Sequence, residues 1–332
     1  MVQSKVICIG EALIDRIINK SNNNYINYLG GAPANVACGL GKYNIDTIFI
    51  GCLGNDEFGK IFGIKFKELK INIDFLQIEQ RFPTRIVKVE ISREGDRCFV
   101  GFQGENNISF ADEMMDASKF RSNMKYLEKI YQQTKYIVTG TLFLATSKTS
   151  EAVRFLLDYA IAFDIKIVID VNWRDIFWDN SAIMRNKSRE EQKNIIKNFL
   201  INADILKLAK EEAFLFFETN DPIQISNSLP KKPDVIITDG SNPIIWFVGG
   251  FSGKSNVTDS CEIVDTTGAG DAFVAGLISQ WVKFPEKNNK DYVVESINYA
   301  SASGLLNCMH KGAIDNLPND NQVKAFLKSK GL

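Results

Sequence analysis

The chain of 332 residues is long enough to bury a large core, and its 45% hydrophobic and 24% charged residues are typical of a globular protein. A net charge of −1 argues against a nucleic-acid or membrane-surface partner, and no apolar run is long enough to span a bilayer. The first residues run directly into an apolar strand, so we expect no signal peptide and a cytoplasmic protein. The six cysteines form no C-x-x-C pair, which predicts reduced and mostly buried thiols.

The first hundred residues predict short strands, two helices and two hairpin-like sections. Apolar or alternating segments predict strands at residues 6–10, 13–18, 25–29, 47–52, 85–92 and 97–102. Helices are expected at residues 33–42, where Pro33 fits a first helical turn, and at residues 58–69. Polar turns at residues 20–24 and 94–96 separate the strands of the two hairpins.

The remainder alternates more regularly between strands and helices. Strands are predicted at residues 136–139, 166–170, 205–208 and 235–238, and helices at 148–163, 189–200, 211–217, 272–282 and 292–306. A further hairpin-like section covers residues 244–264. This alternation predicts an α/β fold, with a doubly wound, mostly parallel sheet flanked by helices. We expect one domain over residues 1–332, with a small β-rich lid formed by segments about 13–29 and 84–103.

The segment Val264-Asp-Thr-Thr-Gly-Ala-Gly-Asp-Ala-Phe273 predicts an anion site. Three small residues before a helix allow backbone N–H groups to converge on one point, and the helix dipole adds to them. Asp271 follows in the first turn, where a carboxylate suits a site that takes a proton from a hydroxyl attacking phosphate; an ordinary N-terminal cap is the alternative. His310 is the single histidine and lies near a predicted helix end, so a carboxylate is the expected general base.

Other polar groups follow the predicted strands of the sheet, where ligands bind in open α/β folds. Asp15 and Asn35 are able to contact sugar hydroxyls, although such residues near turns are more often structural. The pair Glu211-Glu212 could hold magnesium or simply favour a helix N-terminus. Neither a P-loop nor a Rossmann G-x-G-x-x-G motif is present, so any phosphate donor would be held in another way and a nicotinamide enzyme is not expected.

Two segments resemble the paired signatures of the ribokinase/PfkB family of carbohydrate kinases. Residues 30–37, GGAPANVA, resemble the N-terminal signature, and residues 265–271, DTTGAGD, resemble the C-terminal one. They lie more than 200 residues apart in the expected order, and the resemblance spans about residues 5–318. It implies a ribokinase-like fold, ATP and Mg²⁺ as cofactors with K⁺ as a further one, and phosphorylation of a sugar hydroxyl. The early hairpins match the family's lid, which often forms homodimers.

The resemblance also implies roles for individual residues. The catalytic group would be Asp271 as base with the amides of Gly268, Ala269 and Gly270 as the anion hole for the γ-phosphate. Sugar-binding positions would be Asp15, Gly31, Asn35 and Arg174, and nucleotide-side positions Lys207, Thr238, Gly240, Thr267, Gly268 and Gly270. Glu212 would organise Mg²⁺ through water, and a monovalent cation would bind Asp265, Thr267 and the loop near Gly312.

The acceptor is predicted from residues 170–178, in which Asp170, Asn172, Arg174 and Trp178 resemble a segment of fructokinases and 2-keto-3-deoxygluconate kinases. This favours conversion of D-fructose to fructose 6-phosphate, with 2-keto-3-deoxygluconate, ribose or a nucleoside as alternatives. Arg174 would contact the substrate or pair with Asp170 or Asp175. A catalytically silent binding or regulatory protein is the alternative from another class.

Two residues depart from the family pattern on the nucleotide side. Ala209 stands where the Lys-x-Asn-x-x-Glu element has Asn or Ser, and Pro243 replaces the second glycine of the Thr-x-Gly-x-x-Gly loop. The first change removes a polar contact to phosphate or metal-bound water, and the second alters the loop on the adenine side.

Overall fold

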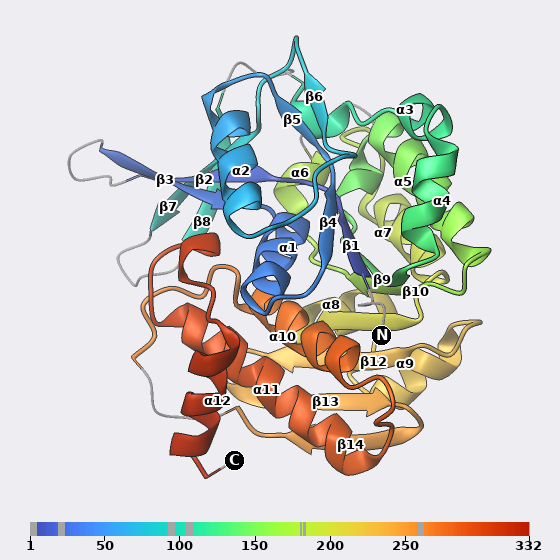
Figure 1. Ribbon diagram of the computed structural model, residues 1–332, viewed down its shortest axis with the longest axis vertical. Coiled ribbons are helices and arrows are strands. Elements are labelled where there is room, and N and C mark those ends of the chain that lie inside the picture. Colours follow the sequence, from blue (N-terminus) through green and yellow to red (C-terminus); the bar gives the residue numbers. More distant parts are fainter. Residues whose placement is uncertain are drawn as a thin grey trace.

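The computed structural model describes residues 5–18, 24–91, 97–103, 109–179, 181, 184–257 and 262–331. An eight-stranded sheet crosses the molecule in the order β14-β13-β12-β11-β10-β9-β1-β4 (Figure 1). Its parallel strands are β1 (Lys5–Ile9), β4 (Thr47–Ile50), β9 (Thr134–Thr139), β10 (Lys166–Asp170), β11 (Ile205–Ala209) and β12 (Asp234–Asp239). The antiparallel strands β13 (Asn242–Val248) and β14 (Phe251–Ser255) extend one edge. The predicted α/β fold with a mostly parallel sheet is confirmed.

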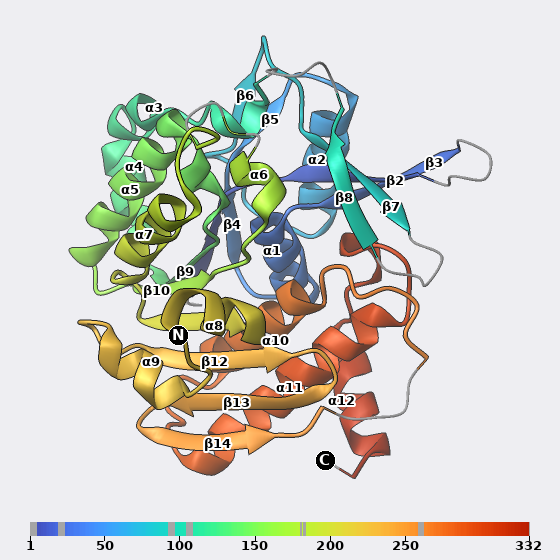
Figure 2. The same cartoon turned by 180° about the vertical axis from the view of Figure 1, so that it is seen from behind.

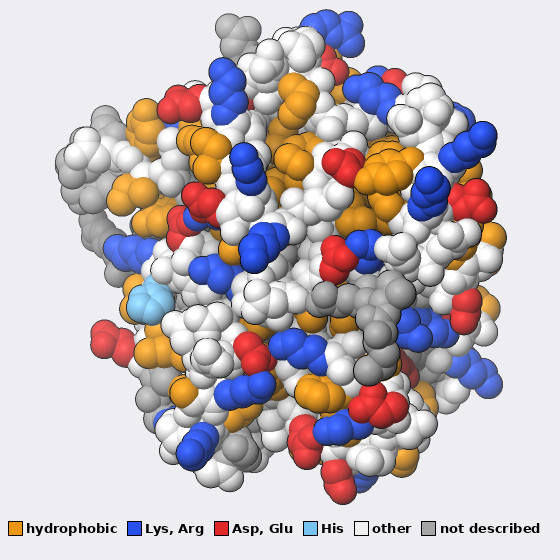
Figure 3. All heavy atoms as spheres, in the orientation of Figure 1, with side chains coloured by type: hydrophobic (Ala, Val, Ile, Leu, Met, Phe, Trp, Pro, Cys, Tyr) orange, Lys and Arg blue, Asp and Glu red, His pale blue; other side chains and the backbone are white. Residues whose placement is uncertain are grey.

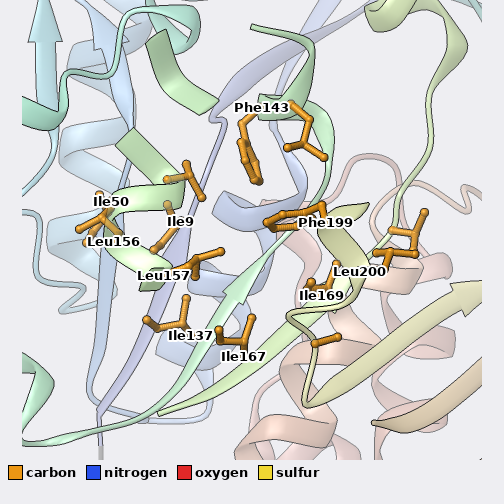
Figure 4. Packing of buried hydrophobic residues seen from close by; sticks show 14 of the residues in the cluster. Ile9, Ile50, Ile137, Phe143, Leu156, Leu157, Ile167, Ile169, Phe199 and Leu200 are labelled. Carbon is orange, nitrogen blue, oxygen red and sulfur yellow. The ribbon is translucent and has the colours of Figure 1, made fainter. Parts of the chain in front are cut away.

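Helices cover both faces of this sheet, because successive strand residues point to opposite sides. Ile7 and Ile9 of β1 join one buried cluster, and Val6 and Cys8 join the other. Figure 4 shows the packing of the first cluster. It includes residues of α3 (Ala117–Arg121), α4 (Met124–Tyr131), α5 (Ser147–Ile161), α6 (Asp175–Asp179), α7 (Arg189–Leu200), α8 (Lys210–Phe217) and α9 (Pro222–Ser228). The second includes residues of α1 (Ala32–Lys42), α2 (Glu57–Glu68), α10 (Ala269–Lys283), α11 (Lys290–Cys308) and α12 (Asp320–Ser329).

A second sheet, the lid sheet, has the order β3-β2-β7-β8 and projects from the main body (Figures 1 and 2). Its strands are β2 (Leu13–Ile18), β3 (Tyr25–Gly30), β7 (Ile86–Ile91) and β8 (Arg97–Phe102). The two predicted hairpins are confirmed as antiparallel pairs, and the parallel pairing of β2 with β7 joins them. Most of the predicted 20–24 turn, and the whole predicted turn at 94–96, lie outside the described residues.

Arg85 fastens the lid sheet to the main body. It immediately precedes β7, and its backbone carbonyl accepts a hydrogen bond from the Ile14 amide of β2. Its buried guanidinium donates to both carboxylate oxygens of Asp112, at 2.8 and 3.0 Å, and to Glu113 at 2.8 Å. These carboxylates belong to the short helix η1 (Ala111–Glu113) of the main body. The rings of Phe102, Phe110 and Phe177 lie within cation–π distance of the same guanidinium.

Several predicted elements differ from those observed. The strand predicted at 47–52 divides into β4 and β5 (Cys52–Gly54), because the chain leaves the main sheet to pair with β6 (Gln77–Glu79). In the predicted hairpin section at 244–264, the described strands end at Ser255. Cys8, Cys38, Cys52 and Cys308 are free and buried, as expected, whereas Cys261 lies outside the described residues. Within the described ranges, none of the helices has the length and apolar character needed to cross a membrane.

Candidate active site

The two signature segments meet where helices α1 and α10 begin. Asn35 lies in the first turn of α1, and Asp271 is the third residue of α10. The Asn35 side-chain amide donates to Asp271 Oδ2 at 2.7 Å, with exposed fractions of only 3% and 9% for the two residues. The two halves of the predicted site therefore form one buried pair, 236 residues apart along the chain.

The turn before α10 has the conformation that its glycine permits. Gly268 caps the helix with φ +74°, a left-handed conformation that side chains disfavour. Gly270 is the second helical residue, a position whose amide has no acceptor within a helix. The Ala269 amide donates to the Thr266 carbonyl at 3.2 Å. Of the three predicted anion-hole amides, Ala269 is thus already engaged.

Lys207 places a positive charge directly beside this turn. Its ammonium nitrogen lies 3.1 and 3.2 Å from the two carboxylate oxygens of Asp170. A Cβ atom built on Gly270 would lie 2.9 Å from the same nitrogen, so Lys207 reaches the backbone of the predicted anion hole. Asp170 and Lys207 are direct partners in the register of the parallel strands β10 and β11. A cation therefore lies where the phosphate is predicted to bind.

The buried charges of the site shift each other's pKa. Burial raises the pKa of Asp271 to about 6, and the charge of Asp170 acts in the same direction. The hydrogen bond from Asn35 and the charges of Lys207 and Arg174 oppose this rise. Burial of Lys207 acts to lower its pKa, but the charges of Asp170, Glu212 and Asp271 outweigh this effect and raise it. The pKa of Asp271 is thus raised toward neutral pH, and a general base is most effective when its pKa lies near the pH at which it works.

Glu212 connects the strand ends on the nucleotide side. One carboxylate oxygen accepts the Ala209 amide and the other accepts the Trp173 amide, both at 2.7 Å. Burial raises the pKa of Glu212. Asp170 Oδ1 is buried and accepts no hydrogen bond from any described residue, although Lys207 lies beside it. Because Mg²⁺ binds one or two carboxylates together with phosphates and water, the residues present fit this ion.

Thr238 and Gly240 lie farther along the same sheet edge. Thr238 is in β12, in register with Ala209 of β11, and Gly240 follows the strand with φ +55°. Beside them, Lys210 pairs with Asp239 at 2.7 Å. The structure therefore places these two predicted nucleotide-side positions beside Ala209, the residue that replaces the Asn or Ser of the family pattern.

Asp15, Gly31 and Asn35 lie at or beside the start of α1, whereas Arg174 lies after β10. Asp15 is a buried residue of β2, and Gly31 caps α1 with φ +98°. Arg174 is exposed and donates to the Trp173 carbonyl at 2.9 Å. Asp170 pairs with Lys207, and Asp175 pairs with Arg189 at 3.3 Å. The two carboxylates suggested as structural partners of Arg174 therefore have other cations beside them.

The loop after α11 contacts the turn that precedes α10. Asp265 accepts the Thr267 amide at 2.9 Å and the Gly312 amide at 2.7 Å. The Thr267 carbonyl accepts the Asn307 side-chain amide at 2.9 Å, so a cation bound there would use its remaining lone pair. These contacts join the three residues predicted for a monovalent cation into one group.

His310 is exposed. Figure 3 shows positive and negative side chains interspersed over one face of the molecule.

Two buried carboxylates of the site were absent from the predicted set. Asp170 was predicted as part of the acceptor motif and as a possible partner of Arg174, yet it neutralises Lys207. Glu11, two residues after the end of β1, accepts the Ala32 amide at 3.2 Å, and burial raises its pKa to about 8. The signal for both was their position, since each ends or follows a parallel strand at the edge where ligands bind.

Comparison with known proteins assigns the chain to a family. Residues 3–320 match the sequence profile of the pfkB family of carbohydrate kinases. The chain is 29% identical to a probable chloroplastic fructokinase-6 of Arabidopsis thaliana, over 98% of this chain and 83% of that protein. It is 26% identical to an ATP-dependent 6-phosphofructokinase of Thermoanaerobacterium thermosaccharolyticum, over 98% and 95% of the two chains.

Solved structures show the same fold. The fructokinase of Xylella fastidiosa with bound ATP superposes with a TM-score of 0.83 at 21% identity, covering 99% of this chain and all of the other. The fructokinase of Vibrio cholerae with fructose, ADP and calcium ion superposes with a TM-score of 0.82 at 22% identity, covering 98% and 100%. With its paired signatures joined in one buried site, this chain belongs to the pfkB family of carbohydrate kinases.

Proposed function

We propose that this kinase transfers the γ-phosphoryl group of ATP to a hydroxyl of a free sugar, D-fructose at O6. The observation that carries the proposal is the 2.7 Å hydrogen bond between Asn35 and Asp271, because it joins the predicted sugar side to the predicted phosphate side. Fructokinases among the relatives, one of them solved with fructose and ADP, support fructose as the acceptor.

In the proposed reaction Asp271 accepts the proton of the sugar hydroxyl. The hydroxyl oxygen attacks the γ-phosphorus, the bond from phosphorus to the bridging oxygen breaks, and ADP leaves. Such a transition state is loose, so positioning and charge stabilisation dominate. The amides of Gly268 and Gly270 and the ammonium of Lys207 supply positive potential at the γ-phosphate. Base assistance contributes about 10²–10⁴-fold.

Mg²⁺ would be held by Asp170 and, through water, by Glu212, and it would neutralise phosphate charge. Glu212 already accepts two backbone amides, which fixes its orientation. Asp170 would then divide its two oxygens between the metal and Lys207.

A panel of acceptors tests the proposal. ADP release is measured with fructose, fructose 6-phosphate, ribose, 2-keto-3-deoxygluconate, adenosine and inosine, with Asp271→Asn as the control. We expect fructose to give the highest kcat/KM and the variant to lose nearly all activity. Turnover of adenosine alone would refute a sugar acceptor. Absence of ADP release with every acceptor would favour a catalytically silent binding protein.

The surroundings of Arg174 favour a second candidate function, the phosphorylation of an acceptor that carries its own negative charge. The neighbouring carboxylates Asp170 and Asp175 have Lys207 and Arg189 beside them, and the charge of Arg174 reaches Asp271. A sugar acid such as 2-keto-3-deoxygluconate, or a sugar phosphate, would then pair with the guanidinium. Arg174→Ala separates the candidates: it raises KM strongly for an anionic acceptor and only slightly for fructose.

We also propose that the lid sheet forms a homodimer. Tyr25 and Ile26 of β3 are 55% and 59% exposed, and Val100 of β8 is 46% exposed. Exposed large apolar side chains on both outer strands of a projecting sheet favour contact with a second copy of the chain.

A further inference from the structure

Tyr28 of the lid sheet touches a loop of the main body. A Cβ atom built on Gly312 would lie 2.4 Å from Cδ1 and 3.0 Å from Cε1 of the Tyr28 ring, so the ring lies directly against the Gly312 backbone. Gly312 has φ +85°, a conformation that suits glycine and leaves room for the ring. In the register of β2 and β3, Tyr28 is the partner of Asp15, a predicted sugar-binding residue.

The loop beneath Tyr28 is bonded to the phosphate-binding turn. The Gly312 amide donates to one oxygen of the buried Asp265 carboxylate at 2.7 Å, and the Thr267 amide donates to the other at 2.9 Å. The next residue, Ala313, packs on Gly268, since a Cβ atom on Gly268 would lie 2.5 Å from that of Ala313. Two contacts therefore tie the loop to the turn that begins α10.

We infer that Tyr28 is a positioning residue that couples the lid sheet to the phosphate-binding turn. When β3 moves, the Tyr28 ring displaces Gly312. Asp265 passes this displacement to Thr267, and Ala313 passes it to Gly268. The phosphate-binding turn would then reach its working geometry only when the lid sheet rests on the site. Coupling of this kind needs an unbroken series of packed and hydrogen-bonded groups. Tyr28, Gly312, Asp265 and Thr267 form such a series.

The inference rests on the proposed transfer of phosphate at this turn, but its test needs no sugar. Coupling between two sites is reciprocal, so binding at the turn must stabilise the lid sheet if the lid sheet acts on the turn. Hydrogen–deuterium exchange of β2 and β3 is measured with and without a non-hydrolysable ATP analogue and Mg²⁺, in the absence of acceptor. A wrong choice of acceptor therefore leaves this result unchanged.

Four proteins are compared: wild type, Tyr28→Ala, Tyr28→Phe and Asn27→Ala. Asn27 is the neighbouring residue on the same strand, but it is exposed and its side chain accepts a hydrogen bond from Arg16 within the lid sheet, so its loss is the matched control. We expect the analogue to slow exchange of β2 and β3 by roughly fivefold or more in wild type, Tyr28→Phe and Asn27→Ala. In Tyr28→Ala this protection disappears, while the analogue still protects residues 262–271.

Two results would overturn the inference: equal protection of the lid sheet in Tyr28→Ala and wild type, or a wild-type lid sheet unaffected by the analogue. Should Tyr28→Ala lose its folded structure by circular dichroism, Tyr28→Leu replaces it under the same criteria, because leucine keeps apolar bulk but lacks the flat ring.

Discussion

Asp271 meets opposite requirements of stability and catalysis. Its carboxylate is buried beside Asp170, which disfavours the charged form and raises its pKa to about 6. A general base must nevertheless be deprotonated when the sugar binds. The same elevated pKa therefore makes Asp271 a better proton acceptor near neutral pH and a source of instability there.

The pH profile should follow from this value. We expect log kcat/KM to rise with a slope near one up to about pH 6 and then level off, because the free enzyme must lose the Asp271 proton. Initial rates at limiting sugar between pH 5 and 8 measure it. A flat profile over this range would contradict Asp271 as the titrating base.

Asp271→Asn should stabilise the protein while removing its activity. A group whose pKa is raised on folding stabilises the fold below its unfolded pKa, and this contribution is lost as the pH rises through about 6. Removing the charge should then raise the unfolding free energy by about 1–3 kcal/mol at pH 7.5, with a smaller gain at pH 5. Urea unfolding at both pH values measures the effect, and a variant less stable at both would contradict it.

Gly270→Ala tests whether the ammonium of Lys207 acts at the phosphate site. The added Cβ would lie 2.9 Å from the ammonium, which must move away while the helical backbone accepts alanine. We expect normal folding and a kcat lower by about 10²-fold, since small displacements of a positioned charge have effects of this size. Gly63→Ala in α2 is the control, because the added methyl would meet no atom within 4 Å apart from its chain neighbours and the backbone of its own helix. Equal kcat in both variants would remove Lys207 from the phosphate site.

At the scale of elements, the lid sheet depends on one buried ion cluster. Arg85→Met leaves Asp112 and Glu113 without their guanidinium and should cost about 3–5 kcal/mol of unfolding free energy. Arg121→Met breaks the exposed pair with Glu151 and should cost at most about 1 kcal/mol. Urea unfolding compares the two, and similar losses would mean that the Arg85 cluster contributes little.

Elements with strong local signals could be predicted to the residue. The sequence predicts α7 at 189–200, where Ser188 and Glu191 form a capping box, and the structure places it there. Helices α9 and α12 were missed, although Asp221 before Pro222 and Asn319 with Gln322 are capping signals too. Helix α9 has only seven residues, too few for an apolar period to stand out, whereas α12 has an amphipathic pattern that the sequence prediction overlooked.

The internal contacts of the site could not be predicted in the same way. The residue types of both signatures were visible in the sequence, but the bond from Asn35 to Asp271 depends on how α1 and α10 pack. The pairing of Asp170 with Lys207 depends on the register of β10 and β11. Register and helix packing result from the whole core, so the sequence predicts the members of the site better than their contacts.

At the scale of the whole molecule, the proposed homodimer is open to a direct test. Ile26→Asp places a charge on the exposed face of β3 and should shift the protein from dimer to monomer in sedimentation experiments. Ile64→Asp, on a 60% exposed residue of α2, is the matched control and should leave the association unchanged. A wild-type protein that sediments as a monomer at micromolar concentration would contradict the proposal.

The distance of 236 residues between Asn35 and Asp271 also bears on the biosynthesis of the protein. Strand β1 lies between β9 and β4, and helix α10 follows all eight strands of the main sheet. During translation the proposed sugar side leaves the ribosome more than 200 residues before the phosphate-binding turn. A nascent chain that stops before residue 268 therefore lacks the proposed means of using ATP. Binding of ATP at this turn would begin only after α10 has emerged and packed against α1.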